Sequence, residues 1–364
     1  MADRFGGKWL FGSCILLSSV VSLVTPAAAR IHIDLVVALR VLSGLGEGVK
    51  RPAAQALIAR WTAPQYYSAV AGIIGVGGDC GVIVGLFWGG FLCDYGFAGG
   101  WPSVFYVFGM VGCVWFFCWC FLCYSSPCTH PRMPTAELEY YEKMIGTIDL
   151  ARYPPTPWRK ILTSVPVWAL TVALLAECFL FNSLMTCLPL YMHDVLGLDM
   201  ETNGALSAVP FLGLITACPV MGVIADWLRS SGRLSTTAIR KISCFAGFML
   251  TDCFLIFVPF VGCNRALAVL NFFLIFVCNS MVFNCVITNQ LDLAPLHAGK
   301  IMGMANTVAN LGAIAGPIVV GVMTSRQSTR STWQNVFFLI AGIDAFGAFV
   351  FLIFGSGNRQ SWAD

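Results

Sequence analysis

Residues 164–191 read SVPVWALTVALLAECFLFNSLMTCLPLY, a run in which only Glu177 carries a charge. A hydrocarbon core of about 30 Å is crossed by about 20 residues of helix, so this run is long enough to span a bilayer. A segment inside lipid must pair its backbone amides internally, which leaves a helix as the expected form. This stretch therefore predicts an all-α membrane protein.

Similar apolar runs recur along the whole chain, and its composition agrees with them. The 364 residues are 58% hydrophobic and only 11% charged, whereas soluble domains carry about 25% charged residues. We expect ten membrane helices, each with bounds good to a few residues: 9–28, 33–59, 68–93, 101–123, 164–191, 202–227, 242–262, 266–289, 299–323 and 333–355.

The distribution of basic residues predicts the orientation. If residue 1 lies in the cytosol, the loops on that side hold fourteen Lys and Arg, whereas the opposite loops hold four. Cytosolic loops of membrane proteins carry the excess of Lys and Arg, so both termini are expected to be cytosolic. The net charge of +3 is small, and we expect the lipid bilayer rather than nucleic acid as the macromolecular partner.

One long hydrophilic segment divides the chain. Residues 124–163 contain six prolines around a charged helical piece near Glu137 to Lys143, and proline at both edges ends the flanking helices. We expect a cytosolic linker there, between a bundle of four helices in residues 1–123 and a bundle of six in residues 164–364.

The first residues resemble a loop found again in the second half. Residues 2–8 read ADRFGGK, and residues 225–233 read ADWLRSSGR. If the halves are parallel repeats, as in many transporters, two helices are missing before residue 1. A cleaved signal peptide ending near residues 27–29 is the alternative, and we expect instead that 9–28 stays in the membrane. The candidate residues of the two loop signatures are Asp3, Arg4, Gly6, Lys8, Gly222, Asp226 and Arg229.

The second predicted span carries the densest set of embedded charges. An ionisable group in a spanning helix costs at least about 2.5–3.5 kcal/mol, so it normally faces a cavity or a partner. The alternative is a buried network that neutralises itself, but three basic residues against one acid leave positive charge over. An anion site is therefore expected on the face formed by Arg40, Gly44, Glu47, Gly48 and Arg51.

Each residue of that face has a chemical reason to take part. Arg40 offers a fork of donors that matches a carboxylate or a phosphate. Glu47 can gain and lose a proton, and Arg51 lies one turn away from it. The two glycines leave room beside the charges. Asp79, Glu177, Asp252 and Asp344 also lie inside spans, where a structural role is as reasonable as a functional one.

Other classes of function lack their sequence signatures. The chain has no Gly-x-x-x-x-Gly-Lys-Ser/Thr loop for ATP, no Gly-x-Ser-x-Gly elbow and no His-Glu-x-x-His pair, so no enzyme activity and no cofactor are expected. Cys123, Cys128 and His130 have a loosely metal-like spacing without a fourth ligand, so no metal site is expected. Most cysteines lie in the spans as small apolar residues.

Several stretches resemble one known family, in order along the chain. The start resembles the end of the loop signature of the major facilitator superfamily. The chain is similar to its anion–cation symporter branch, solute carrier family 17, which holds sialin, the vesicular glutamate transporters and the type I sodium-phosphate cotransporters. The stretches that carry the resemblance are RVLSGLGEG at 40–48 with Pro52 and Trp61, Gly100-Trp101 through to Trp119, Pro189-Leu-Tyr191, LDLAP at 291–295 with Gly303 and Asn306, and Gly355-Ser-Gly with Gln360-Ser-Trp362.

The resemblance implies a twelve-helix fold that alternates access around a central anion site, here without its first two helices. It implies that Arg40 is the substrate-binding arginine and Glu47 the proton-coupling glutamate. The chain departs from the family at Lys50-Arg51, which replaces a Thr-aromatic pair. Glu177 falls where the glutamate transporters place an arginine, which favours a sialin-like or phosphate transporter, with Glu177 as a candidate residue lining the site.

The expected function is a proton-coupled, sialin-like symporter of a small organic anion in the plasma membrane or a lysosomal or vesicular membrane. One alternative keeps the fold and moves inorganic phosphate with Na⁺ in place of H⁺ as the coupling ion. Another is a truncated product that does not transport. The sequence leaves the substrate, the coupling ion and the organelle open.

Overall fold

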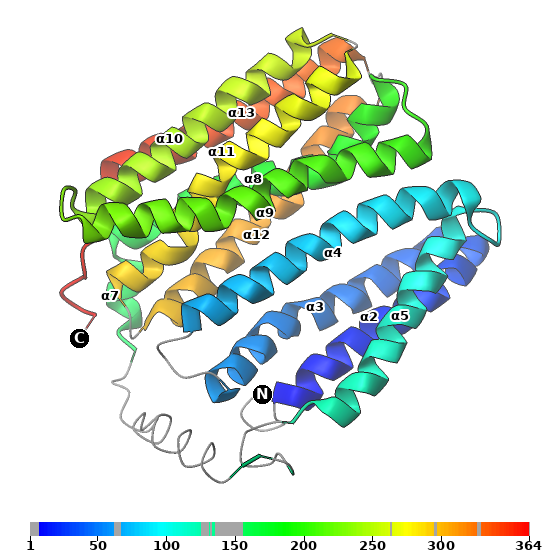
Figure 1. The fold of residues 1–364 in the computed structure, drawn as a ribbon, viewed down its shortest axis with the longest axis horizontal. Helices are drawn as coiled ribbons and strands as arrows, with labels where there is room; N and C mark the ends of the chain where they lie inside the picture. Colours follow the sequence, from blue (N-terminus) through cyan, green and yellow to red (C-terminus); the bar gives the residue numbers. More distant parts are fainter. Residues whose placement is uncertain are drawn as a thin grey trace. The chain divides into compact units, whose positions relative to one another are not determined.

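A computed structural model describes residues 7–61, 67–124, 131, 133–134, 156–262, 264–294, 297–325 and 329–363 of the chain (Figure 1). Within these residues the chain forms ten long α-helices, one short α-helix and one short 3-10 helix. In chain order they are α2 (Gly7–Ile31), α3 (Ile33–Trp61), α4 (Tyr67–Tyr95), α5 (Trp101–Leu122), α7 (Trp158–Leu162), α8 (Val165–Asp194), α9 (Met200–Ser230), α10 (Thr236–Phe257), η4 (Val258–Phe260), α11 (Arg265–Leu293), α12 (Ala298–Thr324) and α13 (Arg330–Phe354).

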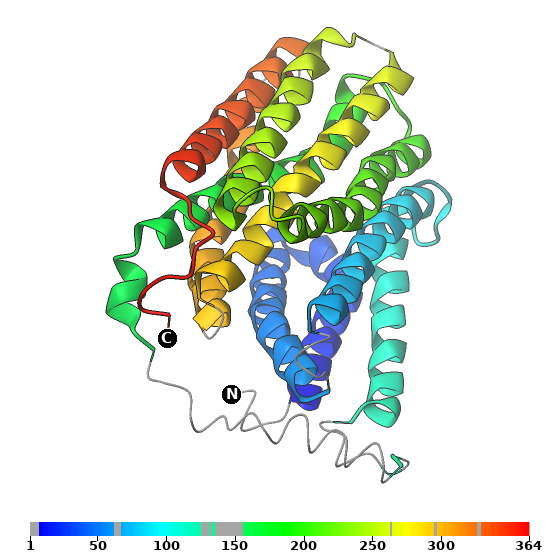
Figure 2. The same cartoon turned by 60° about the vertical axis from the view of Figure 1, so that its left-hand side comes forward.

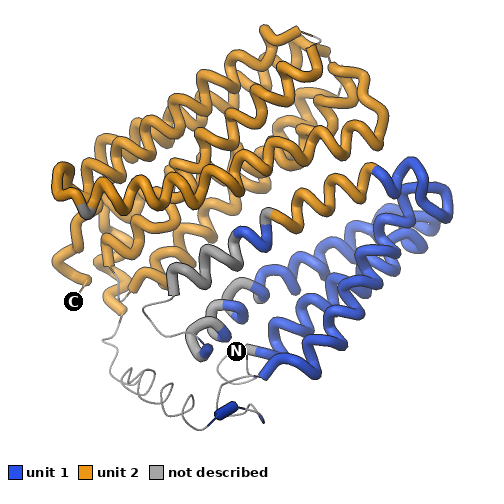
Figure 3. Tube along the Cα trace, viewed as in Figure 1, with its two compact units in different colours: residues 1–78, 91–152 blue, residues 79–90, 153–364 orange. Residues whose placement is uncertain are grey.

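The chain divides into two compact units (Figure 3). Unit 1 comprises residues 1–78 and 91–152, and unit 2 comprises residues 79–90 and 153–364. The division differs from the predicted domains in the linker 124–163, which is split after residue 152, and at one helix. The middle of α4 belongs to unit 2, where Gly90 lies against the backbone of Met200 and Gly204 on α9.

In unit 1, α2 packs along both α3 and α5. Small residues allow the backbones to approach closely, as is common between membrane helices. A Cβ added at Gly112 would lie 2.0 Å from the hydroxyl of Ser19, and one at Gly109 would lie 2.7 Å from Leu23. On the other side of α2, Gly46 of α3 contacts Leu17.

Unit 2 is a bundle in which α8 packs on α12 and α13, α10 on α11 and α13, and α9 on α11 (Figures 1 and 2). Helices α8 and α10 begin at one end of this bundle, and α11 and α13 finish at the same end. We call it the linker end. The core of the opposite half is aromatic. The ring of Tyr191 meets the rings of Phe272, Trp333 and Phe337 edge-on at 5.4–5.7 Å between centroids.

Side-chain caps mark where α9, α10, α11 and α13 begin. The side chains of Asp199, Ser235, Asn264 and Thr329 each accept a hydrogen bond from a backbone N–H of the first turn, at 3.0–3.3 Å. A side-chain oxygen in this position satisfies an amide that has no partner within the helix. The predicted starts at 202, 242, 266 and 333 are therefore one to six residues late, because apolarity begins after the cap.

Nine helices of the described residues are long and apolar enough to cross a membrane. The all-helical membrane fold predicted from the sequence is thereby confirmed. Helix α3 is as long as the others, but its embedded charges exclude it from that set, so its crossing of the membrane stays a prediction. The helical piece predicted near 137–143 lies outside the described residues.

Candidate functional site

Arg40 lies in α3 with its side chain exposed. Its guanidinium is placed over the ring of Phe105 on α5, with 5.3 Å from the guanidinium carbon to the ring centroid. Within the described part of unit 1, no carboxylate forms an ion pair with Arg40. An aromatic face can hold a guanidinium in place while its N–H groups remain available to another acceptor.

Glu47 lies seven residues after Arg40, at the midpoint of α3 and about 10 Å further along the helix axis. The hydroxyl of Ser18 on α2 donates to its Oε1 at 3.1 Å. Its Oε2 pairs with the ammonium of Lys50 one turn on, and the Glu47 side chain remains 45% exposed. Glu47 therefore has local partners and does not contact Arg40.

The other residues predicted on this face are partly described. Gly44 and Gly48 are exposed, and a Cβ at either position would meet nothing within 4 Å, so both border open space. Arg40, Gly44, Glu47 and Gly48 are thus all exposed. The side chain of Arg51 lies outside what the structure describes.

Lys8 links two helices of unit 1. Its ammonium donates to the backbone carbonyl of Cys120 at 2.8 Å and lies 5.1 and 5.3 Å from the ring centroids of Trp9 and Tyr124. The indole N–H of Trp119 donates back to the carbonyl of Lys8 at 3.0 Å. Lys8 therefore joins the start of α2 to the end of α5. Asp3, Arg4 and Gly6 lie outside the described residues.

Residues 225–233 were expected to form a short loop, but the helix continues to Ser230, so only residues 231–233 of this stretch lie outside it. Gly222, Asp226 and Arg229 lie in the last turns of α9, which continues to Ser230. The physical reason is that Trp227 and Leu228 extend the helix beyond the apolar run. Arg229 pairs with Asp292 of α11 at 3.5 Å.

Asp292 forms ion pairs with two arginines at the linker end of unit 2. Its second oxygen accepts a hydrogen bond from Arg240 of α10 at 2.7 Å, and the side chains of Asp292 and Arg240 are only 6% and 11% exposed. The sequence reasoning did not assign Asp292 a role, although the residue lies in the LDLAP stretch at 291–295.

Glu177 occupies a different environment from Arg40. It is buried in unit 2, 3% exposed, and its Oε2 accepts a hydrogen bond from the Nδ2 of Asn279 on α11 at 2.7 Å. Its place in an anion site stays a prediction. Asn279 was not anticipated, because no local spacing connects two residues so far apart in the chain.

The sequence matches the family described as the Major Facilitator Superfamily over residues 1–317. It is 36% identical to vesicular glutamate transporter 2 of Homo sapiens over 368 residues, covering 100% of this chain and 62% of the relative. It is also 36% identical to sialin of Ovis aries, covering 72% of it, and to a putative inorganic phosphate cotransporter of Drosophila ananassae, covering 76% of it. The chain thus spans less than two thirds of the length of the glutamate transporter.

Solved structures resemble the fold at low sequence identity. A bacterial homologue of the human lysosomal transporter Spinster, inward-facing and unoccupied, matches 99% of this chain and 86% of its own, with a TM-score of 0.74 and 14% identity. A D-xylose-proton symporter matches 99% of this chain and 84% of its own, with a TM-score of 0.73 and 13% identity. At such identities the likeness concerns the fold alone.

The family match and the relatives at 36% identity agree with the resemblance found from the stretches around Arg40, Tyr191 and residues 291–295. These relatives are transporters by name, not enzymes. The chain is an integral, multi-pass membrane protein that belongs to the major facilitator superfamily, in its anion–cation symporter branch, solute carrier family 17.

Proposed function

We propose that this chain moves a small organic anion across a membrane by alternating access, with Arg40 as the group that binds the anion. The relatives named above include a glutamate transporter and a putative phosphate cotransporter, so small anions are the common chemical class. All three relatives match at the same 36% identity, so sequence identity does not distinguish among their substrates. The substrate class is therefore inferred from the residues of the site.

One observation carries the proposal: the exposed guanidinium of Arg40 has no carboxylate partner among the described residues. Arg40 is the eighth residue of α3 and lies among exposed apolar side chains such as Val37 and Val41. A charged group in such a position is costly unless a counter-ion or water reaches it. The only acid in the middle of the same helix is already paired with Lys50, so the counter-ion for Arg40 is supplied by the solute.

Proton coupling through Glu47 is the second part of the proposal. Its carboxyl lies at mid-helix on the same open face as Arg40, and its partners are a hydroxyl and an ammonium that are both partly exposed. In this scheme both termini are cytosolic, as the basic loops favour. The membrane is then the plasma membrane or that of a lysosome or vesicle.

Sodium-coupled phosphate transport is the second candidate. The observation in its favour is the phosphate cotransporter relative, and the planar donor fork of Arg40 suits phosphate as well as carboxylate. The third candidate is a product that does not transport by itself.

The test is uptake of radiolabelled organic anions and of inorganic phosphate by liposomes that contain the purified protein. Arg40→Ala is expected to abolish saturable uptake, whereas Arg40→Lys keeps the charge but loses the fork and retains a small part. Arg30→Ala is the matched control, because Arg30 is an exposed arginine in the last turn of α2.

Three outcomes separate the candidates. Uptake that survives Arg40→Ala contradicts the role of Arg40. Uptake of phosphate alone, abolished when choline replaces sodium, favours the second candidate. Wild-type liposomes without any uptake, from protein that is folded by size-exclusion chromatography, favour the third.

A further inference from the structure

Three carboxyl groups lie in the interior of unit 2, on three different helices. Glu177 of α8, Asp252 of α10 and Asp344 of α13 are 3%, 6% and 0% exposed. At about 1.5 Å per residue along each helix, they lie about 18, 24 and 15 Å from the linker end. All three are therefore near the middle of the span. We call these residues the carboxyl cluster.

The cluster converges because the helices that carry it are in contact. A Cβ added at Gly347, one turn from Asp344, would lie 2.7 Å from the Cβ of Ala176, the neighbour of Glu177. Helix α13, which carries Asp344, packs on both α8 and α10, which carry Glu177 and Asp252. The hydrogen bond from Asn279 to Glu177 adds α11 to the same group.

Buried polar atoms without partners surround these carboxyls. Both carboxyl oxygens of Asp252 and of Asp344, and the Oε1 of Glu177, have no hydrogen-bond partner in the described residues. The Oδ1 of Asn279 and the Oγ1 of Thr251 are also without partners, and both residues are 0% exposed. Because the Nδ2 of Asn279 donates to Glu177, its Oδ1 on the same amide carbon also lies beside that carboxyl. A buried oxygen with no partner is costly, so these oxygens need hydrogen-bond donors.

No basic side chain of the described residues compensates the cluster. The described Lys and Arg residues of unit 2 lie in loops or in the first or last two turns of helices. Several are engaged there, for example Arg240 with Asp292 and Arg330 with the carbonyl of Pro259. The titratable groups that the neighbouring helices add are thiols: Cys244 and Cys253 on α10, and Cys278 and Cys285 on α11. The charged residues of α9 and α12 are confined to the ends of those helices.

We propose that the carboxyl cluster is a proton-binding site of the C-terminal bundle, separate from Glu47. Three carboxylates without a cation at mid-membrane repel one another and have lost their hydration, so the cluster needs positive charge. A metal ion does not fit, because no group of three or more His, Cys, Asp and Glu in the described residues is placed to hold one. Each carboxylate that takes up one H⁺ becomes a neutral acid, and its O–H donates to an oxygen that now lacks a partner, such as Asn279 Oδ1.

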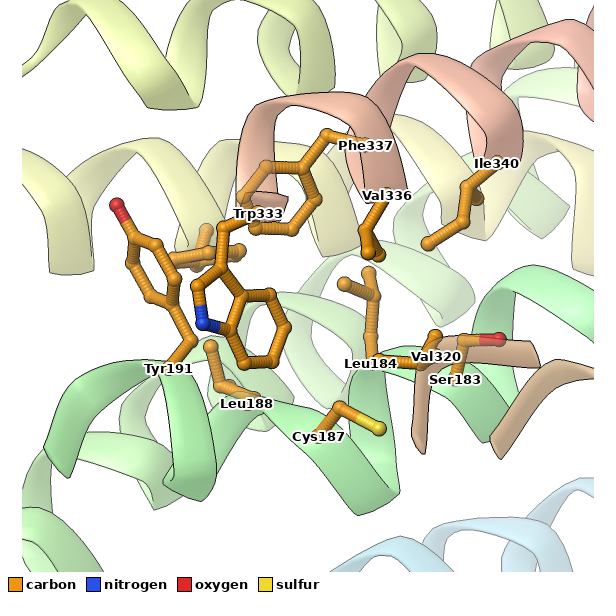
Figure 4. Close-up of a pocket in the computed structure, with 11 residues that line it drawn as sticks. Ser183, Leu184, Cys187, Leu188, Tyr191, Val320, Trp333, Val336, Phe337 and Ile340 are labelled. Atoms are coloured by element: carbon orange, nitrogen blue, oxygen red, sulfur yellow. The ribbon is translucent and has the colours of Figure 1, made fainter. Parts of the chain in front are cut away.

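The pocket in Figure 4 lies within one helical turn of the carboxyl cluster. Ile340, one turn from Asp344, and Leu184, two turns from Glu177 on the same face of α8, both line it. From there the pocket continues to Tyr191 and Trp333 near the end opposite the linker end. Its one hydroxyl at the inner side, on Ser183, has no partner.

The experiment is infrared spectroscopy of the purified protein in lipid, which separates protonated carboxyls from carboxylates by their C=O stretch. The wild-type protein is expected to show a protonated-carboxyl band at neutral pH that shifts in D₂O and is lost as the pH is raised. Glu177→Gln, Asp252→Asn and Asp344→Asn should each remove part of the band, and the triple variant all of it. Glu201→Gln, a surface acid of α9, should leave it unchanged.

Recording the band in a Glu47→Gln background excludes Glu47 as its source. The proposal is overturned if the wild-type protein shows no such band, if the band persists unchanged at every pH, or if sodium removes it while choline does not. None of these three readings uses a cluster variant, so a variant that fails to fold leaves the test intact.

Discussion

Glu47→Gln separates proton coupling from folding, because the structure predicts a small effect on stability. The ion pair with Lys50 joins side chains that are 45% and 36% exposed, and such pairs contribute about 0.2–1 kcal/mol. The hydrogen bond from Ser18 is retained, because the amide oxygen of glutamine also accepts. We therefore expect the variant to lose no more than the contribution of this ion pair, about 1 kcal/mol of stability.

The transport effect of the same change is expected to be large. Glutamine resembles the protonated carboxyl and cannot release a proton, so a pH gradient should no longer accelerate net uptake into liposomes. Exchange of internal for external anion, which needs no net proton movement, should continue. The assay is the ratio of uptake with and without an imposed pH gradient, and we expect this ratio to fall to about one in the variant.

A matched control lies on the same helix. Asp34 is an acid in the first turn of α3, 83% exposed, and pairs with His32. Asp34→Asn should keep the full response to the gradient. The reasoning is refuted if folded Glu47→Gln protein still responds to the gradient, or if Asp34→Asn loses the response to the same extent.

Three further predictions concern unit 2. Arg240→Met should cost about 3 kcal/mol in thermal unfolding, because Asp292 loses its buried partner, and the double variant with Asp292→Leu should recover most of it. Gly204→Ala should cost about 1–3 kcal/mol, since its Cβ would lie 2.6 Å from a backbone carbonyl of α4, whereas Gly85→Ala has open space and should be neutral. Burial and a nearby Lys300 lower the pKa of His297, so stability should fall as the pH drops below about 6.5 in wild-type protein and less so in His297→Gln.

The apolar runs predicted the helices well because the bilayer imposes length and apolarity on each crossing. The ends of the helices were less predictable. Helix α9 continues to Ser230 through a stretch with Asp226 and Arg229, since these side chains lie outside the apolar run but are compatible with a helix. Helix α3 shows the opposite case, in which the charges of a candidate site weaken the apolar signal itself.

The candidate site was predictable only within one helix. Spacing along α3 places Lys50 and Arg51 equally near Glu47, and the described ion pair is with Lys50. Partners on other helices, such as Ser18 for Glu47 and Asn279 for Glu177, depend on how the helices pack, which one sequence does not specify.

The ion pairs of Asp292 also determine where a reporter can be placed. Arg229 and Arg240 fix the two helix ends on either side of the short connection that turns at Gly232, whose φ is +65°. An epitope inserted at this exposed tip leaves both anchors in place, because lengthening an already closed loop costs little. Antibody access to the epitope in sealed cells and in permeabilised cells would therefore report on which side of the membrane this end of the protein lies.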